Sequence, residues 1–500
     1  MNLGRNQLLE HVLATDEWDV IVVGGGATGL GTAVDSAHRG YRTLLLEAHD
    51  FGKGTSSRST KLIHGGVRYL RQGNVKMVIK ALRERGYLLK NASHLVHPLR
   101  FVIPCYRWWH KPWYGIGMKV YDLLARALGI DNSVLLSKEE TLAFLPGLSP
   151  DGLKGGVAYW DGQFDDTRML ISLARTCIQE GGYPLNYMRV TDLIKEKGRT
   201  VGVQVKDLES GQEHKFKSRV VINATGIFTD ALRIMDAPQT KPMMHPAQGI
   251  HVVLDPSVLS PDTAVMIPKT DDGRVLFGVP WHGHILLGTT DTSLDHIDEE
   301  PKPLEEEIDY LLDHFARYTV RPPSRADVLS VFAGLRPLVR SIRSETKSIS
   351  RDHTLKVSKS GLVTITGGKW TTYRQMAQDT VTRAAKTGTL PAKACTTRSL
   401  KLIEAEPIAE QTRLHPDLPY SAADVRRAVQ SEMARTLEDV LARRTRALFL
   451  NARAATDMHQ EVASIMAEEL EWTEERVKEE CAAFLELAQS YLPPPHPNAS

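Results

Sequence analysis

Residues 19–47 read DVIVVGGGATGLGTAVDSAHRGYRTLLLE, and this stretch decides the fold. A short apolar run, Asp19–Val23, leads into a glycine-rich turn and a segment of helical character. A second apolar run, Thr43–Leu46, follows and ends at Glu47. Strand, helix and strand in this order are typical of a β-α-β unit. The sequence therefore predicts an α/β fold.

The glycine turn has the spacing Gly24-x-Gly26-x-x-Gly29 of a dinucleotide site. Gly24 permits a tight turn, Gly26 lets the backbone approach a pyrophosphate, and Gly29 allows the helix to pack closely on the strand. Glu47 is placed to accept hydrogen bonds from the adenosine ribose, which disfavours a 2′-phosphate. A glycine-rich turn without a ligand is the alternative. The surrounding strands, helix and acid favour a site for FAD or NAD, between which this pattern does not decide.

The rest of the chain divides into three further regions. The runs 174–182, 201–205 and 219–226 again carry helix and strand signals. Between about residues 240 and 345 the pattern changes to short strands with turn signals, which predicts an antiparallel sheet that covers the substrate. The run 361–386 returns to strand, glycine turn and helix, so a late segment is expected to complete the first domain. From about residue 395 the sequence is helical.

The composition excludes several classes of protein. The 500 residues are 42% hydrophobic and 24% charged, which argues against disorder and against a disulfide-built scaffold. The net charge of +2 makes nucleic-acid binding unlikely. The four cysteines are too scattered for a CxxC metal or redox motif, so we expect no metal site. No run approaches the ~20 apolar residues of a membrane-spanning helix, and the N-terminus lacks the pattern of a signal peptide.

One window departs from this balance. Residues 51–100 hold eleven Lys or Arg against a single acid, Glu84. A solvated basic face explains the excess, and so does a site that holds anions, because clustered cations raise the local concentration of anions. Both interpretations remain open from the sequence.

Longer motifs separate FAD from NAD. They are GTSSRSTKLIHGGVRYLRQG at 54–73, NATG at 223–226, GTTD at 288–291, AGLRPL at 333–338, GGKWTTYR at 367–374 and VLARRTRALFL at 440–450. These motifs, in this order and across nearly the whole chain, resemble the FAD-dependent glycerol-3-phosphate dehydrogenases. The resemblance implies FAD as the cofactor, oxidation of sn-glycerol 3-phosphate to dihydroxyacetone phosphate, and transfer of the electrons to a quinone.

The resemblance also implies the architecture. We expect an α/β protein with a Rossmann-like FAD-binding domain, an antiparallel-sheet substrate domain and a C-terminal α-helical domain. The oxidoreductase region is expected at 18–390, and within it FAD binding falls to 18–100, 155–240 and 345–390. The substrate-covering part is expected at about 240–345, and the C-terminal helical domain at 391–490.

Matching the family motifs residue by residue implies a set of roles at the substrate. Arg336 and Lys369 are expected nearest the reacting carbon, together with His251, whose ordinary pKa of about 6.5 suits proton transfer. A histidine that only packs in the core is the alternative for His251. The expected substrate contacts are Arg68 and Tyr69 on the phosphate side, and Arg351. Which residue takes the proton is not decided by the sequence.

Further residues are expected to contact the cofactor. Ser57 and Thr60 would help to hold the pyrophosphate through their hydroxyl groups. His64, with the side-chain-free backbone that follows it, would lie against the flavin ring. The glycines assigned to the cofactor in these later motifs are Gly65, Gly66, Gly226, Gly367 and Gly368.

The stretch Arg107–Lys119 interleaves Trp and Tyr with cations. Such a mixture suits the headgroup region of a membrane, and a buried aromatic cluster is the alternative. With the resemblance, it predicts peripheral attachment to the inner face of the cell membrane from the cytoplasm. A homodimer is also considered. The competing functions are a glycerol-3-phosphate oxidase that uses oxygen and a flavin-binding regulator without turnover.

Overall fold

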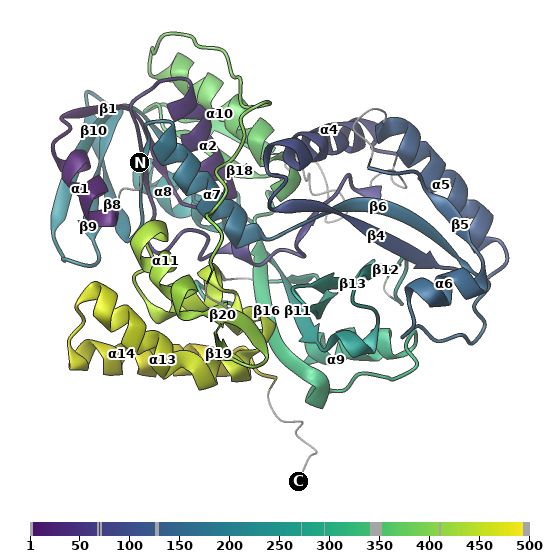
Figure 1. Ribbon diagram of the computed structural model, residues 1–500. Coiled ribbons are helices and arrows are strands. Elements are labelled where there is room, and N and C mark those ends of the chain that lie inside the picture. The colour runs from purple at the N-terminus through teal and green to yellow at the C-terminus, as the bar shows by residue number, and fades with distance from the viewer. Residues whose placement is uncertain are drawn as a thin grey trace.

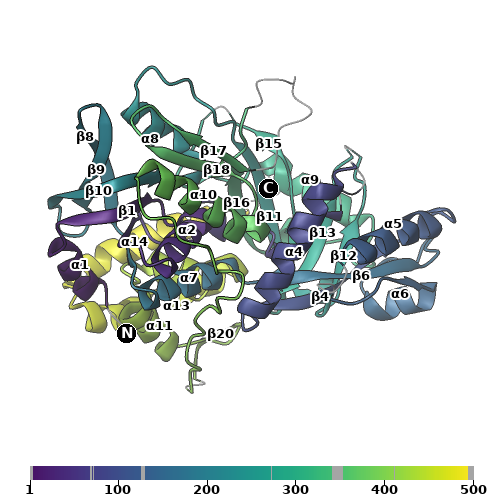
Figure 2. The same ribbon diagram turned by 90° about the horizontal axis from the view of Figure 1, so that it is seen from above.

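The computed structural model shows two sheet-containing parts side by side, with C-terminal helices packed beneath the first part (Figure 1). The structure describes residues 4–67, 70, 73–125, 130–271, 273–294, 296–340, 353–409 and 412–493. Seen from above, α5 and α6 lie over the second part, away from the first, whereas α4 lies between the two parts (Figure 2). Within the described residues, no helix combines the length and apolar character needed to cross a membrane.

The first sheet contains the predicted β-α-β unit. Its strands in spatial order are β17 (His353–Val357), β18 (Val363–Gly367), β10 (Glu213–Asn223), β1 (Glu17–Val23), β2 (Thr43–Leu46) and β7 (Tyr183–Leu185), with β9 (Arg199–Asp207) and β8 (Met188–Glu196) continuing from β10. β1 pairs parallel with β2 and with β10, and β10 pairs parallel with β18. The late strand β18 thus completes the first sheet, as the sequence predicts.

Helices cover this sheet. α2 (Ala27–His38) packs against both α7 (Asp166–Gln179) and α10 (Tyr373–Thr387). The shorter α1 (Arg5–Leu13) packs on β7, and α8 (Thr229–Asp236) on β10 and β18. Parallel strands covered by helices are buried on both faces, which explains the continuous apolar runs of β1 and β2.

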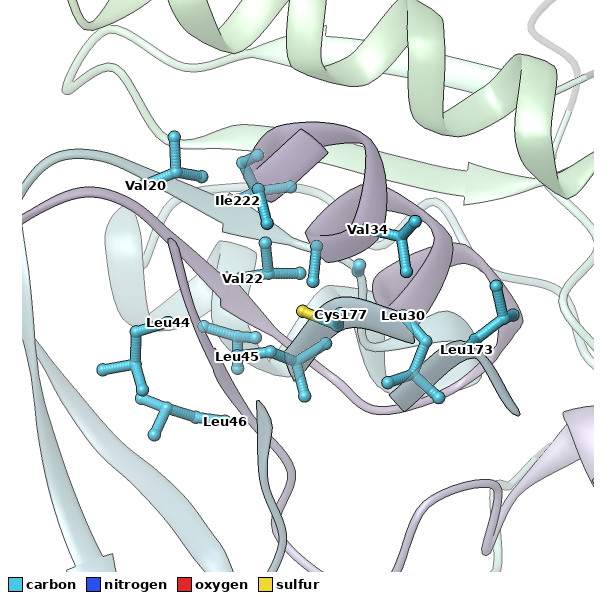
Figure 3. Close-up of a cluster of buried hydrophobic side chains, with 14 of the residues drawn as sticks. Val20, Val22, Leu30, Val34, Leu44, Leu45, Leu46, Leu173, Cys177 and Ile222 are labelled. Atoms are coloured by element: carbon cyan, nitrogen blue, oxygen red, sulfur yellow. The ribbon is translucent and has the colours of Figure 1, made fainter. Parts of the chain in front are cut away.

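The core between these layers is aliphatic. Val20 and Val22 of β1 lie near Leu30 and Val34 of α2, and Leu44–Leu46 of β2 are also fully buried (Figure 3). Removing one such side chain from water stabilises the fold by about 1.5–3 kcal/mol. The glycine turn between β1 and α2 is therefore held on a rigid support.

The second sheet is mainly antiparallel. Its strands in spatial order are β15 (Thr292–Ser293), β11 (Ala247–Leu254), β14 (His284–Gly288), β13 (Leu276–Trp281), β12 (Thr263–Ile267), β4 (Val96–Pro104), β6 (Gly156–Phe164) and β3 (Leu62–Ile63); β16 (Val328–Arg336) pairs with β11 and β5 (Val134–Leu136) with β6. The β12–β4 pair is parallel. Its helices are α4 (Val75–Asn91), α5 (His110–Ala125), α6 (Lys138–Phe144) and α9 (Glu305–Ala316).

The second sheet takes in more of the chain than the sequence indicates. β3, β4 and β6 come from segments that the predicted boundaries give to FAD binding, yet they pair with the strands of residues 240–345. The reason is topological, because β4 lies beside β12 through a pairing between segments far apart in the chain, which no local pattern reveals.

The C-terminal part begins with a hairpin and continues as helices. These elements are β19 (Arg413–His415), β20 (Leu418–Ser421), α11 (Ala422–Glu432), α12 (Ala447–Leu450), α13 (Ala452–Leu470) and α14 (Glu474–Gln489). Arg444 donates to both carboxylate oxygens of Asp50 in the first part, at 2.6 and 2.8 Å. Both side chains are almost fully buried, so losing one partner would cost about 3–5 kcal/mol.

The fold class predicted from the sequence, an α/β protein with a C-terminal helical domain, is confirmed.

Candidate active site

A single large cavity joins the glycine turn to the second sheet. Its volume is about 1500 Å³, above the ~300–1,000 Å³ of most ligand pockets. The predicted residues that line it are Gly24, Gly26, Glu47, Thr60, His64, Gly66, Gly226, His251, Arg336, Gly367, Gly368 and Lys369. Gly29, Ser57 and Gly65 are not among the lining residues. Arg68, Tyr69 and Arg351 lie outside the described residues.

The glycine turn has the geometry that an anion cradle needs. Gly24 has a φ of +111°, which favours glycine, and α2 begins at Ala27 after an N-cap residue, Gly26, that has no side chain. A Cβ on Gly29 would lie 1.8 Å from the carbonyl oxygen of Gly24. The helix N-terminus can therefore lie close to the turn, where the N–H groups of a first helical turn favour a phosphate.

Ser56, and not the predicted Ser57, faces this turn. The Ser56 hydroxyl accepts a hydrogen bond from the Ala27 N–H at 3.0 Å, whereas Ser57 donates to the carbonyl of Gly54 and is buried. Residues 55–57 form a 3₁₀ turn, in which consecutive side chains point about 120° apart. A run of two serines does not tell which one faces the turn.

Glu47 is oriented by backbone N–H groups. Its carboxylate accepts hydrogen bonds from the N–H of Gly25 and of His49. Burial raises the pKa of this carboxyl group above its ordinary value. Its side chain lines the cavity, and its contact with the ribose stays a prediction.

Arg336 is held at the end of β16 by four acceptors. Its guanidinium donates to the carbonyls of Gln248 (3.0 Å) and Thr290 (2.7 Å), to the Thr289 hydroxyl (3.1 Å) and to Asp291 (2.9 Å). The GTTD motif thus supplies three of the four acceptors, a role that the sequence leaves unassigned for its threonines. The motif itself is the signal that could have indicated this cradle.

Two glycines make room for the side chains of the site. A Cβ on Gly249 would lie 2.2 Å from the Arg336 guanidinium, and one on Gly288 would lie 2.3 Å from the His251 ring. Gly249 and His251 are two apart on β11 and so lie on the same face of the sheet. The structure therefore brings Arg336 and His251 to the same cavity, and their roles in the reaction stay predictions.

His251 differs from the expectation in its titration. Its ring is buried, stacks on Phe332, and its Nε2 lies 2.9 Å from the Thr60 hydroxyl. Burial and the positive charges of Lys61 and Arg336 lower the pKa of His251 well below 6.5. The imidazole is therefore neutral at physiological pH, and its pKa is not the ordinary one that the sequence suggests.

Thr60 likewise differs from its predicted role. Its side chain bonds to His251 and not to the glycine turn, although it does line the cavity. The following residue, Lys61, is fully buried and donates to Asp166 and to the Ser57 carbonyl, both at 2.7 Å. Asp166 also accepts from the Ser59 hydroxyl at 2.7 Å. These contacts fix the loop that presents Thr60, and the sequence gives no sign of them.

The late loop brings Lys369 to the same cavity. Gly367 and Gly368, after β18, have φ values of +76° and +78°, which favour glycine. The Thr371 hydroxyl then donates to the His64 carbonyl at 3.4 Å, so the loop lies beside the HGG motif. Gly65 faces away from the cavity, because a Cβ there would meet the Tyr121 hydroxyl at 2.2 Å.

Comparison with known proteins places this geometry in a family. A family model described as "FAD dependent oxidoreductase" matches residues 19–374, and one described as "C-terminal domain of alpha-glycerophosphate oxidase" matches residues 362–477. The mitochondrial glycerol-3-phosphate dehydrogenase of Bos taurus is 40% identical over 96% of this chain and 73% of its own length. The chain belongs to the FAD-dependent glycerol-3-phosphate dehydrogenase family.

Other members of the family agree. The mitochondrial glycerol-3-phosphate dehydrogenase of Schizosaccharomyces pombe is 36% identical over 94% of this chain and 86% of its own length. A solved structure of the glycerol-3-phosphate dehydrogenase from Bacillus halodurans, complexed with FAD, has a TM-score of 0.78 and 29% identity over 98% of both chains. The predicted cofactor, FAD, is confirmed by family membership.

The residues of this chain fit FAD. Gly26 leaves open the space next to Ser56, because a Cβ there would approach the Ser56 hydroxyl to 3.0 Å. The first turn of α2, in which Ser56 bonds the Ala27 N–H, has further N–H groups that would hold a pyrophosphate, and Glu47 lies at the end of β2, where the ribose of a bound dinucleotide is found. When bound, FAD supplies the acceptor for a hydride.

Proposed function

We propose that this chain oxidises sn-glycerol 3-phosphate to dihydroxyacetone phosphate at FAD and passes the electrons to a quinone. The observation that carries the proposal is the placement of Arg336 beside His251 in the cavity that contains the glycine turn. A site that oxidises a secondary alcohol needs a hydride acceptor, a proton acceptor and cations near the developing alkoxide. FAD would be the hydride acceptor, and the cavity contains residues suited to the other two roles.

The chain's own residues would orient the substrate and take the proton. Arg336 is fixed by four hydrogen bonds and needs little rearrangement to stabilise an alkoxide, and Lys369 adds a second cation. The neutral imidazole of His251 is able to accept the hydroxyl proton. Because its pKa is low, it would pass that proton on and would not keep it. Arg68, Tyr69 and Arg351 are assigned to the substrate by their motifs alone.

An anaerobic titration tests this function. Glycerol 3-phosphate should bleach the flavin absorbance of the holoenzyme, and Arg336→Met or Lys369→Met should slow this bleaching on the order of 100-fold. A quinone analogue should then restore the colour faster than air does. Faster recovery in air would favour the oxidase, and an absence of bleaching would leave the flavin-binding regulator.

The exposed face of α5 supports the proposals of membrane attachment and quinone access. Trp113, Ile116 and Leu123 are 61, 68 and 72% exposed and form one stripe with Val120. Trp113, Ile116 and Val120 also line the cavity. An apolar stripe at the mouth of the cavity suits an interface with lipid, where a quinone would enter.

Liposomes test the attachment. Replacing Ile116 and Leu123 together by Ser should weaken sedimentation with anionic vesicles and slow reduction of a long-chain quinone. Leu13→Ser is the matched control, because Leu13 is 49% exposed on α1, in the other sheet-containing part. If the double variant sediments like the parent, α5 is not the attachment surface.

The remaining sequence predictions belong to the same proposal. The boundaries stay predictions, with FAD binding at 18–100, 155–240 and 345–390, a substrate part at about 240–345 and a helical domain at 391–490, although β3, β6 and the start of β4 belong to the second sheet. The location is the inner face of the cell membrane, and the homodimer stays a prediction that sedimentation equilibrium would test.

A further inference from the structure

A strap of the second part, defined as residues 296–304, crosses to the first part of the molecule. It connects β15 to α9. The carbonyl of Lys302 accepts a hydrogen bond from Gln248 of β11 at 3.1 Å, and the Leu304 N–H donates to Glu307 at 3.2 Å. One end of the strap is therefore fixed to the substrate sheet.

Glu300 anchors the strap to the loop between β2 and β3. Arg58 donates to both of its carboxylate oxygens, at 2.8 and 2.7 Å, and the ammonium group of Lys53 lies 3.2 Å away. Burial would raise the pKa of Glu300, but the charges of Arg58 and Lys53 outweigh it and lower the pKa. The Arg58 side chain is almost completely buried, so this contact is a strong attachment.

Glu299, next to the anchor, is attached far more weakly. Its carboxylate lies 3.3 Å from Nε2 of His49 and 3.8 Å from the guanidinium of Arg189, and its side chain is 57% exposed. Exposed ion pairs at such distances contribute little to stability and are screened by salt. The strap thus combines a firm anchor with an adjacent contact that opens easily.

This weak contact lies at the dinucleotide end of the cavity. Glu299, His49 and Arg189 all line the cavity, as does Glu47 at the end of β2. In a β-α-β dinucleotide site, the acid at the end of the second strand marks the position of the adenosine ribose. The strap therefore passes over the end of the cavity that receives the adenosine half of FAD.

The C-terminal part supports the anchor. The Tyr491 hydroxyl donates to Glu300 at 3.0 Å. Lys53 is also paired with Glu438, which in turn pairs with Arg443. Because these residues follow the end of the oxidoreductase part, the helical domain contributes directly to holding the strap in place.

We propose that the strap retains FAD, with Glu299 as the contact that opens when the cofactor enters or leaves and Glu300 as the anchor that the C-terminal domain holds. The proposal rests on FAD as the cofactor and is independent of the substrate proposed above. It gives the C-terminal domain a function in cofactor retention.

The test is the rate of FAD release from the holoenzyme, followed by the rise in flavin fluorescence after dilution into excess flavin-binding scavenger. Glu299→Gln should speed release about two- to five-fold, the range expected for an exposed ion pair. Added salt should speed release from the parent and have little effect on the variant. Glu300→Gln should release FAD at least about ten-fold faster, because it removes a buried charged partner.

Asp298→Asn is the matched control. Asp298 has the same exposure as Glu299, and its contact is with His296 on the strap itself. Its FAD release should equal that of the parent. Tyr491→Phe should lie between the parent and Glu300→Gln. Release at the parental rate and with parental salt dependence from Glu299→Gln would overturn the proposal. In every loaded variant, bleaching by glycerol 3-phosphate should keep the parental rate, so failure of the substrate assignment would show separately.

Discussion

The Thr60 hydroxyl lies 2.9 Å from Nε2 of His251. This contact connects the loop between β2 and β3 to strand β11 of the second sheet. The contact spans the two parts of the molecule and lies at the wall of their common cavity. Because the ring also stacks on Phe332 at 5.0 Å, hydroxyl and phenyl together fix its plane. The orientation of His251 therefore depends on a residue of the loop between β2 and β3.

Replacing Thr60 by Val keeps the shape of the side chain and removes its hydroxyl. We expect flavin reduction by glycerol 3-phosphate to slow about two- to ten-fold, since one neutral hydrogen bond contributes about 0.5–1.5 kcal/mol. Stopped-flow bleaching of the flavin measures the rate. Ser57→Ala removes a buried hydroxyl of the same loop that does not line the cavity, and it should reduce at the parental rate. Equal rates in parent and Thr60→Val would show that this hydrogen bond does not matter for reduction.

The pH dependence of reduction should reveal the charge next to His251. Lys61 has a pKa lowered to about 7 by burial, so it is charged in acid, where it lowers the pKa of His251. Lys61→Met removes that charge and should raise the pKa of His251. A larger fraction of the imidazole is then protonated at any acidic pH, and the acid limb of the reduction rate should move to higher pH. Above about pH 8, where Lys61 of the parent is neutral, the pH profiles of the parent and of Lys61→Met should converge. An unmoved acid limb would mean that His251 does not limit reduction.

Glu307, buried on α9, organises the loop that cradles Arg336. It accepts hydrogen bonds from Thr290 (2.7 Å), Thr292 (2.6 Å) and Gln248 (2.8 Å). In Glu307→Gln the amide NH₂ faces hydrogen-bond donors, so the loop should shift and misplace the guanidinium. We expect substrate-driven flavin reduction to fall roughly 10- to 100-fold, which corresponds to about 1.5–3 kcal/mol.

The control for Glu307 is its neighbour. Glu306→Gln alters an exposed carboxylate on the same helix and should leave reduction unchanged. Dithionite should reduce the flavin of both variants equally, which separates a misplaced Arg336 from a lost cofactor. If Glu307→Gln reduces with glycerol 3-phosphate as the parent does, Arg336 keeps its place without this carboxylate.

The parts of the site that the sequence predicts are those fixed by local structure. Gly24, Gly26 and Gly29 follow from the steric needs of one turn and one helix, and in the structure all three lie where β1 meets α2. Ser56 was missed because the rotation of a short turn decides which of two serines faces the ligand. Lys61 and Glu307 were missed because Asp166 and the threonines that they contact lie in other segments, and buried polar contacts leave no periodic pattern in a sequence.

Adding a methyl group to Gly26 and to Gly29 should have different effects on the protein. Gly26 has ordinary extended backbone angles, so Gly26→Ala strains no backbone, and its Cβ crowds only the Ser56 hydroxyl and the space for the pyrophosphate. We expect a folded protein that binds FAD weakly or not at all, with the thermal stability of the parental apoprotein.

A Cβ on Gly29 would overlap the Gly24 carbonyl at 1.8 Å and would force α2 away from β1. Gly29→Ala should therefore lower the unfolding temperature of the apoprotein itself, by about 1–3 °C for an overpacking cost of about 1–3 kcal/mol in a chain of 500 residues. Thermal unfolding followed by circular dichroism, with flavin content measured by absorbance, distinguishes the two. A Gly26→Ala protein that retains FAD with parental affinity would show that the pyrophosphate does not approach this residue.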